Sequence, residues 1–163
     1  MEKSENPMRR IEIEKVVLNI GVGEPGEKLE HAKTILEKIT GRKAVYRKTK
    51  RRTTFGVAKG RNIGVIVTVR KDADKLLKRL FKAVEEKLDK NCFSGRTFSF
   101  GIEEYISIPG IDYDPKIGIL GMDVCVVLRR PGFKKGIKIG KNHRISSEEA
   151  RNFIKEKFGI NIV

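Results

Sequence analysis

Apolar residues alternate with polar ones in several short segments of the chain, and a period of two is typical of strands with one buried face. In segment 63–70, for example, three valines at alternate positions would point to one side of a sheet and Thr68 and Arg70 to the other. Five segments with this pattern are predicted to be strands: 11–20, 44–49, 63–70, 97–102 and 122–129.

A second pattern, with apolar residues three and four positions apart, predicts three helices. The predicted helical segments are 29–39, 73–88 and 147–158. Their ends carry residues that commonly start and stop helices: Asp72 and Ser146 as N-caps, Glu149 as the capping-box partner of Ser146, and Gly41 and Gly159 as C-terminal stops.

This order of elements predicts an α+β fold, with a mostly antiparallel sheet of about five strands and the helices packed on one face. The other face of the sheet would be open to a partner. With 163 residues, of which 39% are hydrophobic, the chain is predicted to form one domain over 1–163. It has no run of about 18 apolar residues, so no membrane-spanning helix is expected.

The positive charge of the chain is concentrated in two segments. The chain has 36 Lys and Arg against 21 Asp and Glu, a formal net charge of +15. Nine of these bases and no acid lie in 42–61, and seven bases and no acid lie in 129–144. Such dense charge repels itself, which favours binding to a polyanion over a merely solvated loop and tail. We therefore predict that nucleic acid binds a basic loop at 49–62 and a basic segment at 129–145.

Polar side chains on the open sheet face would complete this interface. Asn19 and Thr68, with Arg70 beside them, suit the sugar hydroxyls, phosphates and base edges of RNA. In the loop, Phe55 follows three cations and two threonines and could stack on an unpaired base. Burial of Phe55 against the domain is an equally good interpretation, because solitary aromatic residues are usually buried.

Residues 21–26 have the G-x-G-x-x-G spacing of a dinucleotide-binding turn. That motif also needs an acid about 20 residues further on, and none occurs before Asp72. Glu24 and Pro25 are also unfavourable beside a phosphate. We interpret the segment as a strand-to-helix turn and predict no cofactor, which leaves a nucleotide-dependent enzyme as the alternative hypothesis.

Catalytic and metal-binding patterns are absent from the sequence. His31 and His143 stand apart, as do Cys92 and Cys125, without the spacing of a zinc site. We expect both cysteines to be reduced and buried, and we predict that the protein is not an enzyme. A third hypothesis, binding to anionic membrane surfaces, is disfavoured because charge is balanced along the three predicted helices.

Six motifs follow one another along nearly the whole chain: VLNIGVG (17–23), ITGRK (39–43), IG with VTVR (63–70), FSFGI (98–102), IPGIDYD (108–114) and GMDV (121–124). Each is weakly specific alone, but in this order they resemble the ribosomal protein L5 family, the universal 5S rRNA-binding proteins of the large subunit. The RPGF and KNHRIS motifs at 130–133 and 141–146 are similar to the archaeal and eukaryotic form.

The resemblance implies a protein of the central protuberance that joins 5S rRNA to large-subunit rRNA and reaches the P-site tRNA. It also implies a monomer on cytoplasmic ribosomes, beside other large-subunit proteins. The rRNA contacts that it implies are Asn19, Arg42, Lys43, Arg47, Thr68 and Arg70. The loop that would face tRNA contains Lys50, Arg51, Arg52, Thr53, Thr54, Phe55, Lys59 and Arg61. The basic segment on rRNA contains Arg129, Arg130, Lys134, Lys135, Lys138, Lys141, His143 and Arg144.

Overall fold

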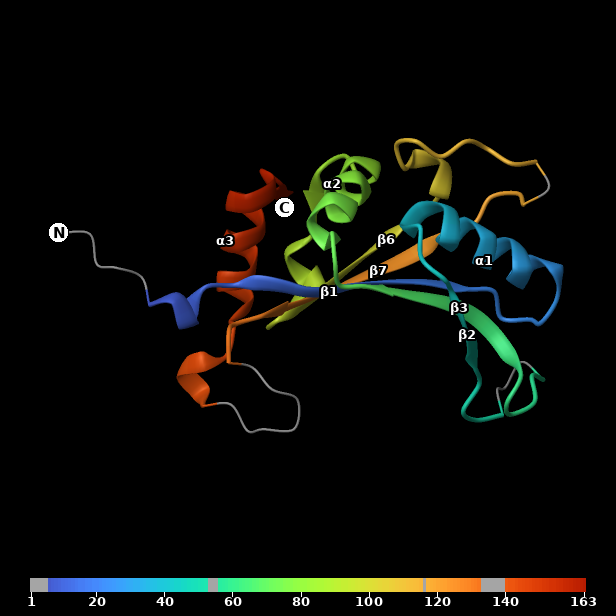
Figure 1. Cartoon of the computed structure of the whole chain (residues 1–163), viewed down its shortest axis with the longest axis horizontal. Helices are drawn as coiled ribbons and strands as arrows, with labels where there is room; N and C mark the ends of the chain where they lie inside the picture. The colour runs from blue at the N-terminus through green and yellow to red at the C-terminus, as the bar shows by residue number, and fades with distance from the viewer. Residues whose placement is uncertain (1–5, 53–55, 116, 133–139) are drawn as a thin grey trace.

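The computed structural model describes residues 6–52, 56–115, 117–132 and 140–163. In these residues three α-helices pack on a six-stranded sheet, and the fold is of the expected α+β class (Figure 1). The α-helices are α1 (Glu27–Thr40), α2 (Ala73–Ala83) and α3 (Ser147–Phe158). The strands are β1 (Glu12–Gly21), β2 (Val45–Lys48), β3 (Asn62–Val69), β4 (Lys87–Leu88), β5 (Phe93–Ser94), β6 (Thr97–Ile102), β7 (Met122–Arg129) and β8 (Asn161–Ile162). Short 3-10 helices are η1 (Pro7–Arg9), η2 (Lys90–Cys92), η3 (Tyr105–Ser107) and η4 (Lys141–His143).

The strands of the main sheet lie in the order β2-β3-β1-β7-β6-β5, and every neighbouring pair is antiparallel. β1 lies near the middle, where Val16 pairs with Val69 of β3 and with Val126 of β7. β7 is distant from β1 in the sequence, yet it lies between β1 and β6. All five predicted strands are present, and β5 is an addition at the edge.

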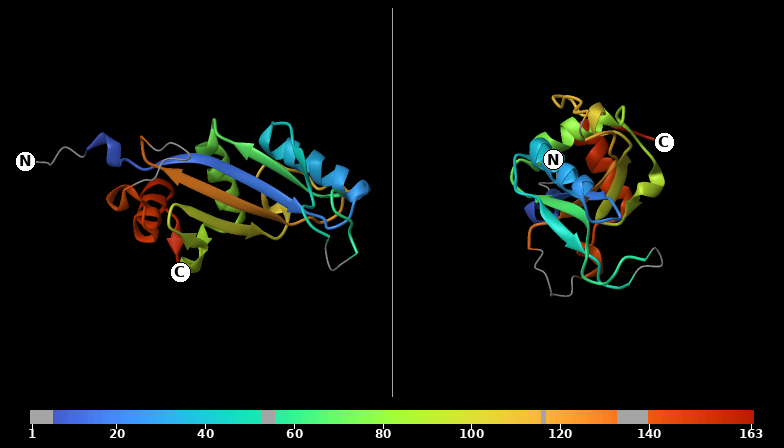
Figure 2. Two further views of the ribbon diagram at one scale, coloured as in Figure 1. Left: turned by 90° about the horizontal axis from the view of Figure 1, so that it is seen from below. Right: turned by 90° about the vertical axis from the view of Figure 1, so that its right-hand side faces the viewer.

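One face of the sheet is buried beneath the helices (Figures 1 and 2). α1 packs against β3, α2 against β1 and α3 against β5. The buried side chains occupy alternate positions of the long strands: Val16, Leu18, Ile20, Val65, Val67, Val69, Phe98, Phe100, Ile102, Met122, Val124, Val126 and Leu128. Full burial of one such side chain contributes about 1.5–3 kcal/mol. A one-residue slip would expose a whole row, so this pattern fixes the register of the sheet.

The helix ends follow the local signals in the sequence. α1 stops at Gly41, whose φ of 63° is the left-handed conformation that glycine adopts without strain. α3 starts at Ser146, whose side chain accepts a hydrogen bond from the backbone NH of Glu149, while the Glu149 side chain accepts one from the Ser146 NH. This predicted capping box is confirmed, and Gly159 ends α3 as expected.

The second helix is shorter than predicted. α2 ends at Ala83, and Glu85 and Glu86 follow with positive φ values of 53° and 59°. Leu88 lies in β4 and not on the helix, so the predicted span of 73–88 is wrong at its C-terminal end. Asp72 does occupy the N-cap position, but its side chain makes no capping hydrogen bond.

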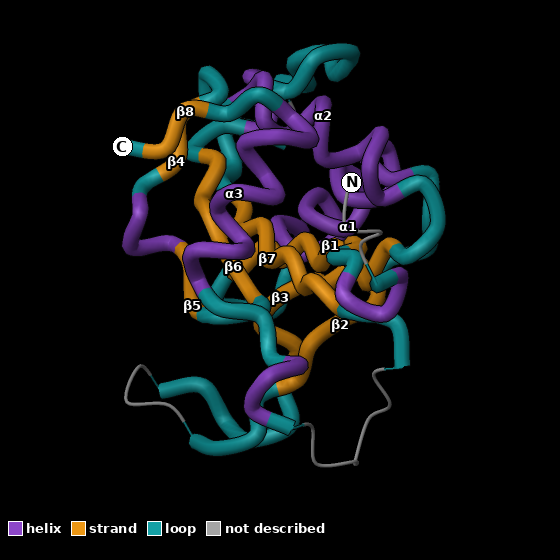
Figure 3. The backbone as a smooth tube through the Cα atoms, turned by 90° about the vertical axis from the view of Figure 1, so that its left-hand side faces the viewer, coloured by secondary structure: helices purple, strands orange, loops and turns teal. Residues whose placement is uncertain are grey.

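A small parallel pair, β4 and β8, joins the end of the chain to the segment after α2 (Figure 3). Lys87 pairs with Asn161 and Leu88 with Ile162. The backbone NH of Lys90 also donates to the carbonyl oxygen of Val163 at 2.9 Å. The last residues of the chain are therefore held by hydrogen bonds to a distant segment.

Candidate nucleic-acid interface

The sheet face opposite the helices carries side chains that are half-buried or exposed, and Figure 2 (left) views the sheet from this side. We call it the uncovered face. Strand pairing places these side chains on it: Lys15, Val17, Asn19, Val45, Arg47, Ile66, Thr68, Thr97, Ser99, Asp123, Cys125, Val127 and Arg129. They are mostly polar or small, which suits contact with a polar partner.

Two predicted contact residues are neighbours on the uncovered face. Asn19 of β1 lies opposite Ile66 of β3, and Val17 lies opposite Thr68. Asn19 and Thr68 are therefore diagonal neighbours across the two strands, close enough for one ligand to touch both side chains.

A hollow of about 670 Å³ lies at the β2 side of this face, and Asn19, Arg47 and Lys50 contribute to its lining. Gly21 and Gly64 also line it, and they lie directly opposite each other on β1 and β3. Gly21 is exposed and has no side chain, so a partner can approach the backbone closely at this position. The hollow thus combines an amide, the three cations Arg47, Lys48 and Lys50, and accessible backbone.

Asp123 is a polar residue of this face that the sequence analysis did not assign. The side-chain NH2 group of Asn19 donates to its Oδ2 at 3.3 Å. A carboxylate repels phosphates, yet it accepts hydrogen bonds from 2′-hydroxyl groups and base amino groups. The signal was available, since Asp123 is the only acid in the GMDV motif and alternates with Met122 and Val124.

Cys125 corrects the expectation that both cysteines are buried. It lies exposed on the uncovered face, opposite Val17 of β1 and Ser99 of β6, and it is a free thiol. Desolvation by its surroundings, with a smaller effect from the nearby Asp123 carboxylate, raises the pKa of this thiol above its ordinary value of 9.0. Cys92 is also free and is half-buried.

The basic loop projects on the same side of the sheet as the uncovered face (Figure 1). Its base is closed around Thr49, which is buried. The Thr49 NH donates to the Arg61 carbonyl at 2.9 Å, and its hydroxyl donates to the Ala58 carbonyl at 3.0 Å. Five predicted loop residues are exposed: Lys50, Arg51, Arg52, Lys59 and Arg61. The predictions for Thr53, Thr54 and Phe55 lie outside the described residues.

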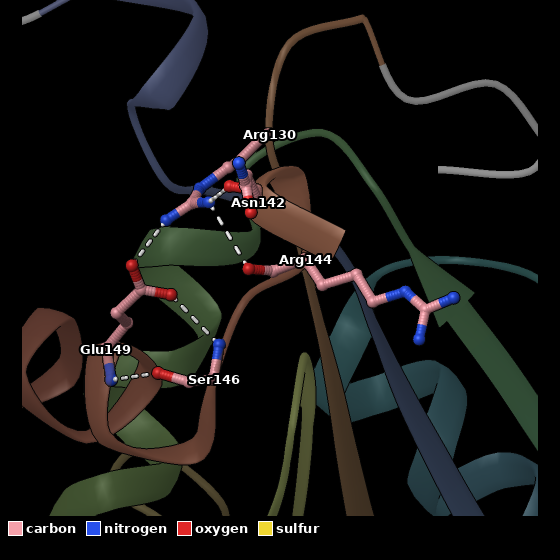
Figure 4. Close-up of polar contacts among 5 residues, drawn as sticks. All are labelled: Arg130, Asn142, Arg144, Ser146 and Glu149. Carbon is pink, nitrogen blue, oxygen red and sulfur yellow. Dashed lines mark hydrogen bonds and ion pairs between the residues drawn. The ribbon is translucent and has the colours of Figure 1, made fainter. Parts of the chain in front are cut away.

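The described part of the second basic segment is held to α3 through Arg130 (Figure 4). The Arg130 guanidinium is 2.7 Å from Glu149 Oε1 and donates to the carbonyl oxygens of Asn142 and Arg144 at 3.4 and 3.3 Å. With 6% of its surface exposed, Arg130 is committed to these internal contacts. The contact of Arg130 with rRNA stays a prediction, and the structure shows that its guanidinium holds the segment to α3.

The other residues of this segment are placed differently. Arg129 is exposed and lies 3.4 Å from Glu12, and Lys141 and Arg144 are also exposed. The Arg144 side chain points away from the cluster around Glu149 (Figure 4). His143 is half-buried, with Nε2 3.1 Å from the Pro131 carbonyl oxygen. The predictions for Lys134, Lys135 and Lys138 lie outside the described residues.

Glu149 is the acid that joins the capping box to Arg130. The backbone NH of Ser146 has the largest effect and lowers the pKa of the Glu149 carboxyl below its ordinary value of 4.5. The Arg130 guanidinium lowers it further. The carboxylate is therefore charged at neutral pH, as both of its hydrogen-bond donors require.

Three predicted rRNA residues lie away from the hollow. Arg42 is half-buried beyond the end of α1 and donates to the Lys71 carbonyl at 3.0 Å, and Lys43 beside it is exposed. Arg70 is exposed beyond the end of β3, where it helps to line a separate hollow with Arg10 and Lys157. The structure thus brings Asn19 and Arg47 together at the hollow and places Thr68 diagonal to Asn19. It does not bring Arg42, Lys43 or Arg70 to the same place.

The glycine-rich turn has the architecture expected of a strand-to-helix connection. The backbone NH groups of Val22 and Gly23 both donate to the Ile63 carbonyl, at 3.0 and 2.9 Å. β1 also pairs antiparallel with both of its neighbours, unlike the first strand of a dinucleotide-binding unit. The described residues contain no group of three or more His, Cys, Asp or Glu side chains that could hold a metal ion.

Within the described ranges, no helix is long and apolar enough to cross a membrane.

Comparison with known proteins gives a consistent result along the chain. The family model of ribosomal protein L5 matches residues 6–56, and the model of the C-terminus of the ribosomal L5 family matches residues 62–160. Three archaeal proteins named large ribosomal subunit protein uL5 are similar over almost their full length. The protein of Nanoarchaeum equitans is 45% identical, covering 98% of this chain and 99% of its own. Those of Sulfolobus acidocaldarius and Cenarchaeum symbiosum are 45% and 47% identical and cover 99% and 96% of this chain, and 96% and 98% of their own.

Proposed function

The chain belongs to the ribosomal protein L5 family, and we propose that it is a structural protein of the large ribosomal subunit that binds 5S rRNA. Its relatives are named as large-subunit proteins and not as enzymes. In this proposal the protein acts as a monomer on cytoplasmic ribosomes and needs no cofactor. It joins 5S rRNA to large-subunit rRNA in the central protuberance, beside neighbouring ribosomal proteins.

The observation that carries the proposal is the position of the two basic segments relative to the uncovered face. In Figure 1 the β2–β3 loop and the stretch containing η4 both lie on the side opposite the helices, at opposite ends of the sheet. An RNA attracted by these cations would therefore meet Asn19, Arg47 and Thr68 between them. Charge supplies the affinity and the association rate, and the side chains of the sheet supply the selectivity.

We assign 5S rRNA contacts to Asn19, Arg47 and Thr68, with Arg42, Lys43 and Arg70 at the margins of the interface. Arg129, Lys134, Lys135, Lys138, Lys141, His143 and Arg144 would contact rRNA backbone, and Arg130 is left out because it is buried. The basic loop would reach the P-site tRNA with Lys50, Arg51, Arg52, Thr53, Thr54, Phe55, Lys59 and Arg61. The hydrogen bonds that close the loop at Thr49 fix its base on the sheet, which supports a separate role for the exposed cations beyond that base.

The direct test is binding of the purified protein to 5S rRNA in competition with tRNA across a salt series. We expect selective 5S binding that persists at physiological salt. If roughly six to ten phosphates are neutralised, the logarithm of the affinity should fall with the logarithm of salt with a slope of several units. Binding that disappears with salt and ignores the identity of the RNA would contradict the proposal.

Two double variants distinguish the role of the basic loop from that of the uncovered face. Asn19→Ala with Arg47→Gln should weaken 5S binding by about tenfold or more, because charged and neutral hydrogen bonds at the interface are lost. Arg51→Gln with Arg52→Gln should change it by less than about threefold but slow translation by reconstituted ribosomes. Lys50 is left unchanged because it lines the hollow beside Asn19. A large loss of 5S affinity in the loop variant would contradict the assignment of the loop to tRNA.

A further inference from the structure

Asp123 is a charged residue of the uncovered face whose presence the proposed function does not explain. It is exposed near the start of β7, where it lies opposite Asn19 of β1 and Gly101 of β6. A carboxylate at this place repels every phosphate that approaches the sheet. In a chain with a net charge of +15, such an acid opposes the attraction that the two basic segments provide.

The charge of Asp123 is not used in an ion pair that holds the fold. Glu12 gives the contrast, because it lies opposite Arg129 at the start of β1 and is 3.4 Å from its guanidinium. Among the described residues, no ion pair includes Asp123. The carboxylate therefore faces solvent with its charge uncompensated by a neighbouring base.

The hydrogen bond with Asn19 leaves acceptors open to a partner. The Asn19 amide donates its NH2 group to Asp123 Oδ2 at 3.3 Å. Because an ionised carboxylate only accepts, the amide turns its donor toward Asp123 and keeps its own oxygen as an acceptor. On the other side of Asp123, Gly101 has no side chain, and a Cβ atom there would meet nothing within 4 Å. The Asn19 oxygen and the Asp123 carboxylate are thus neighbouring acceptors on one part of the face.

We propose that Asp123 is a selectivity residue of the 5S rRNA interface, where it accepts hydrogen bonds from donor groups of the RNA. RNA offers such donors in the ribose 2′-hydroxyl and in the Watson–Crick edge of an unpaired guanine, whose N1–H and N2–H groups match the two oxygens of a carboxylate. Phosphates have only acceptors, so they cannot make this contact. This step rests on the proposed function, because it takes the uncovered face as the 5S rRNA site.

A carboxylate in this role acts on two kinds of RNA in opposite directions. An RNA held only by its backbone is repelled, but the repulsion between exposed, screened charges changes affinity by less than about threefold. An RNA that places a donor on Asp123 gains a base contact, and a good bidentate contact discriminates by roughly fivefold to 100-fold. Asp123 therefore lowers the general affinity slightly and raises the selectivity by more.

Two variants of the full chain separate this role from simpler ones. Asp123→Asn keeps an oxygen that can accept from Asn19, but it replaces the second acceptor with an NH2 donor. Asp123→Ala removes both contacts. The control is Glu103→Gln, which removes one negative charge from an exposed position just beyond β6. All three variants should keep the melting temperature of wild type, because both acids are exposed.

The first measurement is the affinity of each protein for 5S rRNA and for a fully paired RNA duplex at the same salt concentration. We expect Asp123→Asn and Asp123→Ala to bind 5S rRNA about tenfold more weakly, because a donor of the RNA loses its acceptor. Both should bind the duplex as tightly as wild type or up to about threefold more tightly, because a repelling charge is gone. Glu103→Gln should bind both RNAs with wild-type affinity or slightly more tightly.

The second measurement identifies the donor. 5S rRNA is prepared with sparse inosine in place of guanosine, which removes the N2 amino group, or with sparse 2′-deoxynucleotides. Molecules that still bind are separated, and the substituted positions are mapped. We expect a position at which the substitution weakens binding to wild type but not to Asp123→Asn. An inosine effect assigns the donor to guanine, and a deoxynucleotide effect assigns it to the ribose.

Three outcomes would overturn this inference. Equal or tighter 5S binding by Asp123→Asn would mean that the carboxylate only repels phosphates. A loss in Asp123→Ala without a loss in Asp123→Asn would mean that it only orients Asn19. Identical maps for wild type and Asp123→Asn would mean that no donor group contacts it. Failure of the proposed function is distinct, because wild type would then bind 5S rRNA no better than the duplex.

Discussion

Cys125 offers a natural probe for the uncovered face because its thiol is exposed among the proposed contact residues. The thiolate is the form that reacts with maleimides. Since the pKa of this thiol is raised, alkylation should be slow at neutral pH and faster as the pH increases. In a Cys92→Ser background, we expect bound 5S rRNA to slow alkylation severalfold, as measured by mass spectrometry. An unchanged rate with saturating 5S rRNA would mean that the RNA lies elsewhere.

Gly64 and Gly21 form a matched pair for substitution. A Cβ atom at Gly64 would lie 2.9 Å from the Ile20 carbonyl oxygen, a backbone atom that cannot move away cheaply, whereas at Gly21 it would meet nothing within 4 Å. We expect Gly64→Ala to lower the free energy of unfolding by about 1–3 kcal/mol through overpacking. Gly21→Ala should be neutral or up to about 1 kcal/mol more stable. Urea unfolding of both variants measures the difference, and equal stabilities would contradict the close strand approach.

At the scale of elements, the attachment of the second basic segment to α3 should depend on pH through Glu149. The pKa of the Glu149 carboxyl is lower in the folded protein than in the unfolded chain. The charged carboxylate therefore stabilises the fold when the pH is above its ordinary pKa of 4.5. That stabilisation is lost as the pH falls through the folded pKa. We expect Glu149→Gln to be less stable than wild type at pH 7, with a difference that shrinks below pH 4.5. Thermal unfolding of both proteins over this pH range measures the difference in stability. A difference that does not change with pH would argue against the charged contact with Arg130.

The sequence predicts the elements whose pattern is long and strongly periodic, and it fails where a few residues depend on distant partners. The long strands and the caps of α1 and α3 are confirmed, because burial and capping act locally. The turn after α2 was missed because Glu85 and Glu86 favour helices, and nothing local signals their positive φ. β4 and β8 have two residues each, too few for a period, and they are defined by their pairing. The role of Arg130 was missed because it arises from Asn142, Arg144 and Glu149, which fold back onto it.

The candidate interface also has features that the sequence predicts and features that depend on distant partners. The two basic segments and the outward positions of Asn19 and Thr68 were predictable from charge and alternation. The contact of Asn19 with Asp123 was not, because it depends on β7 lying beside β1. Arg42 and Arg70 were grouped with Asn19 in the sequence, but the fold places them at the ends of elements.

For the whole molecule, the net charge of +15 should make salt act in opposite directions on stability and on RNA binding. Like charges destabilise the free protein by mutual repulsion. Added salt screens them, with a Debye length that falls to about 8 Å at physiological ionic strength. We expect the melting temperature of the free protein to rise between about 20 and 300 mM NaCl while 5S affinity falls. A melting temperature that decreases over this range would show that attractive ion pairs outweigh the repulsion.

The place of β7 between β1 and β6 has a consequence for how the chain matures. β1, β3 and α1 are complete early in synthesis, but the strand that covers the second edge of β1 ends at Arg129. At about 5–20 residues per second, the 60 residues from 70 to 129 take roughly 3–12 s to make. During that interval β1 is the unpaired edge of the nascent half-sheet, at the place that becomes the middle of the finished sheet. The half-sheet already carries its cationic loop. Its hydrogen-bonding edge is then open to wrong pairing, and the emergence of residues 122–129 closes it.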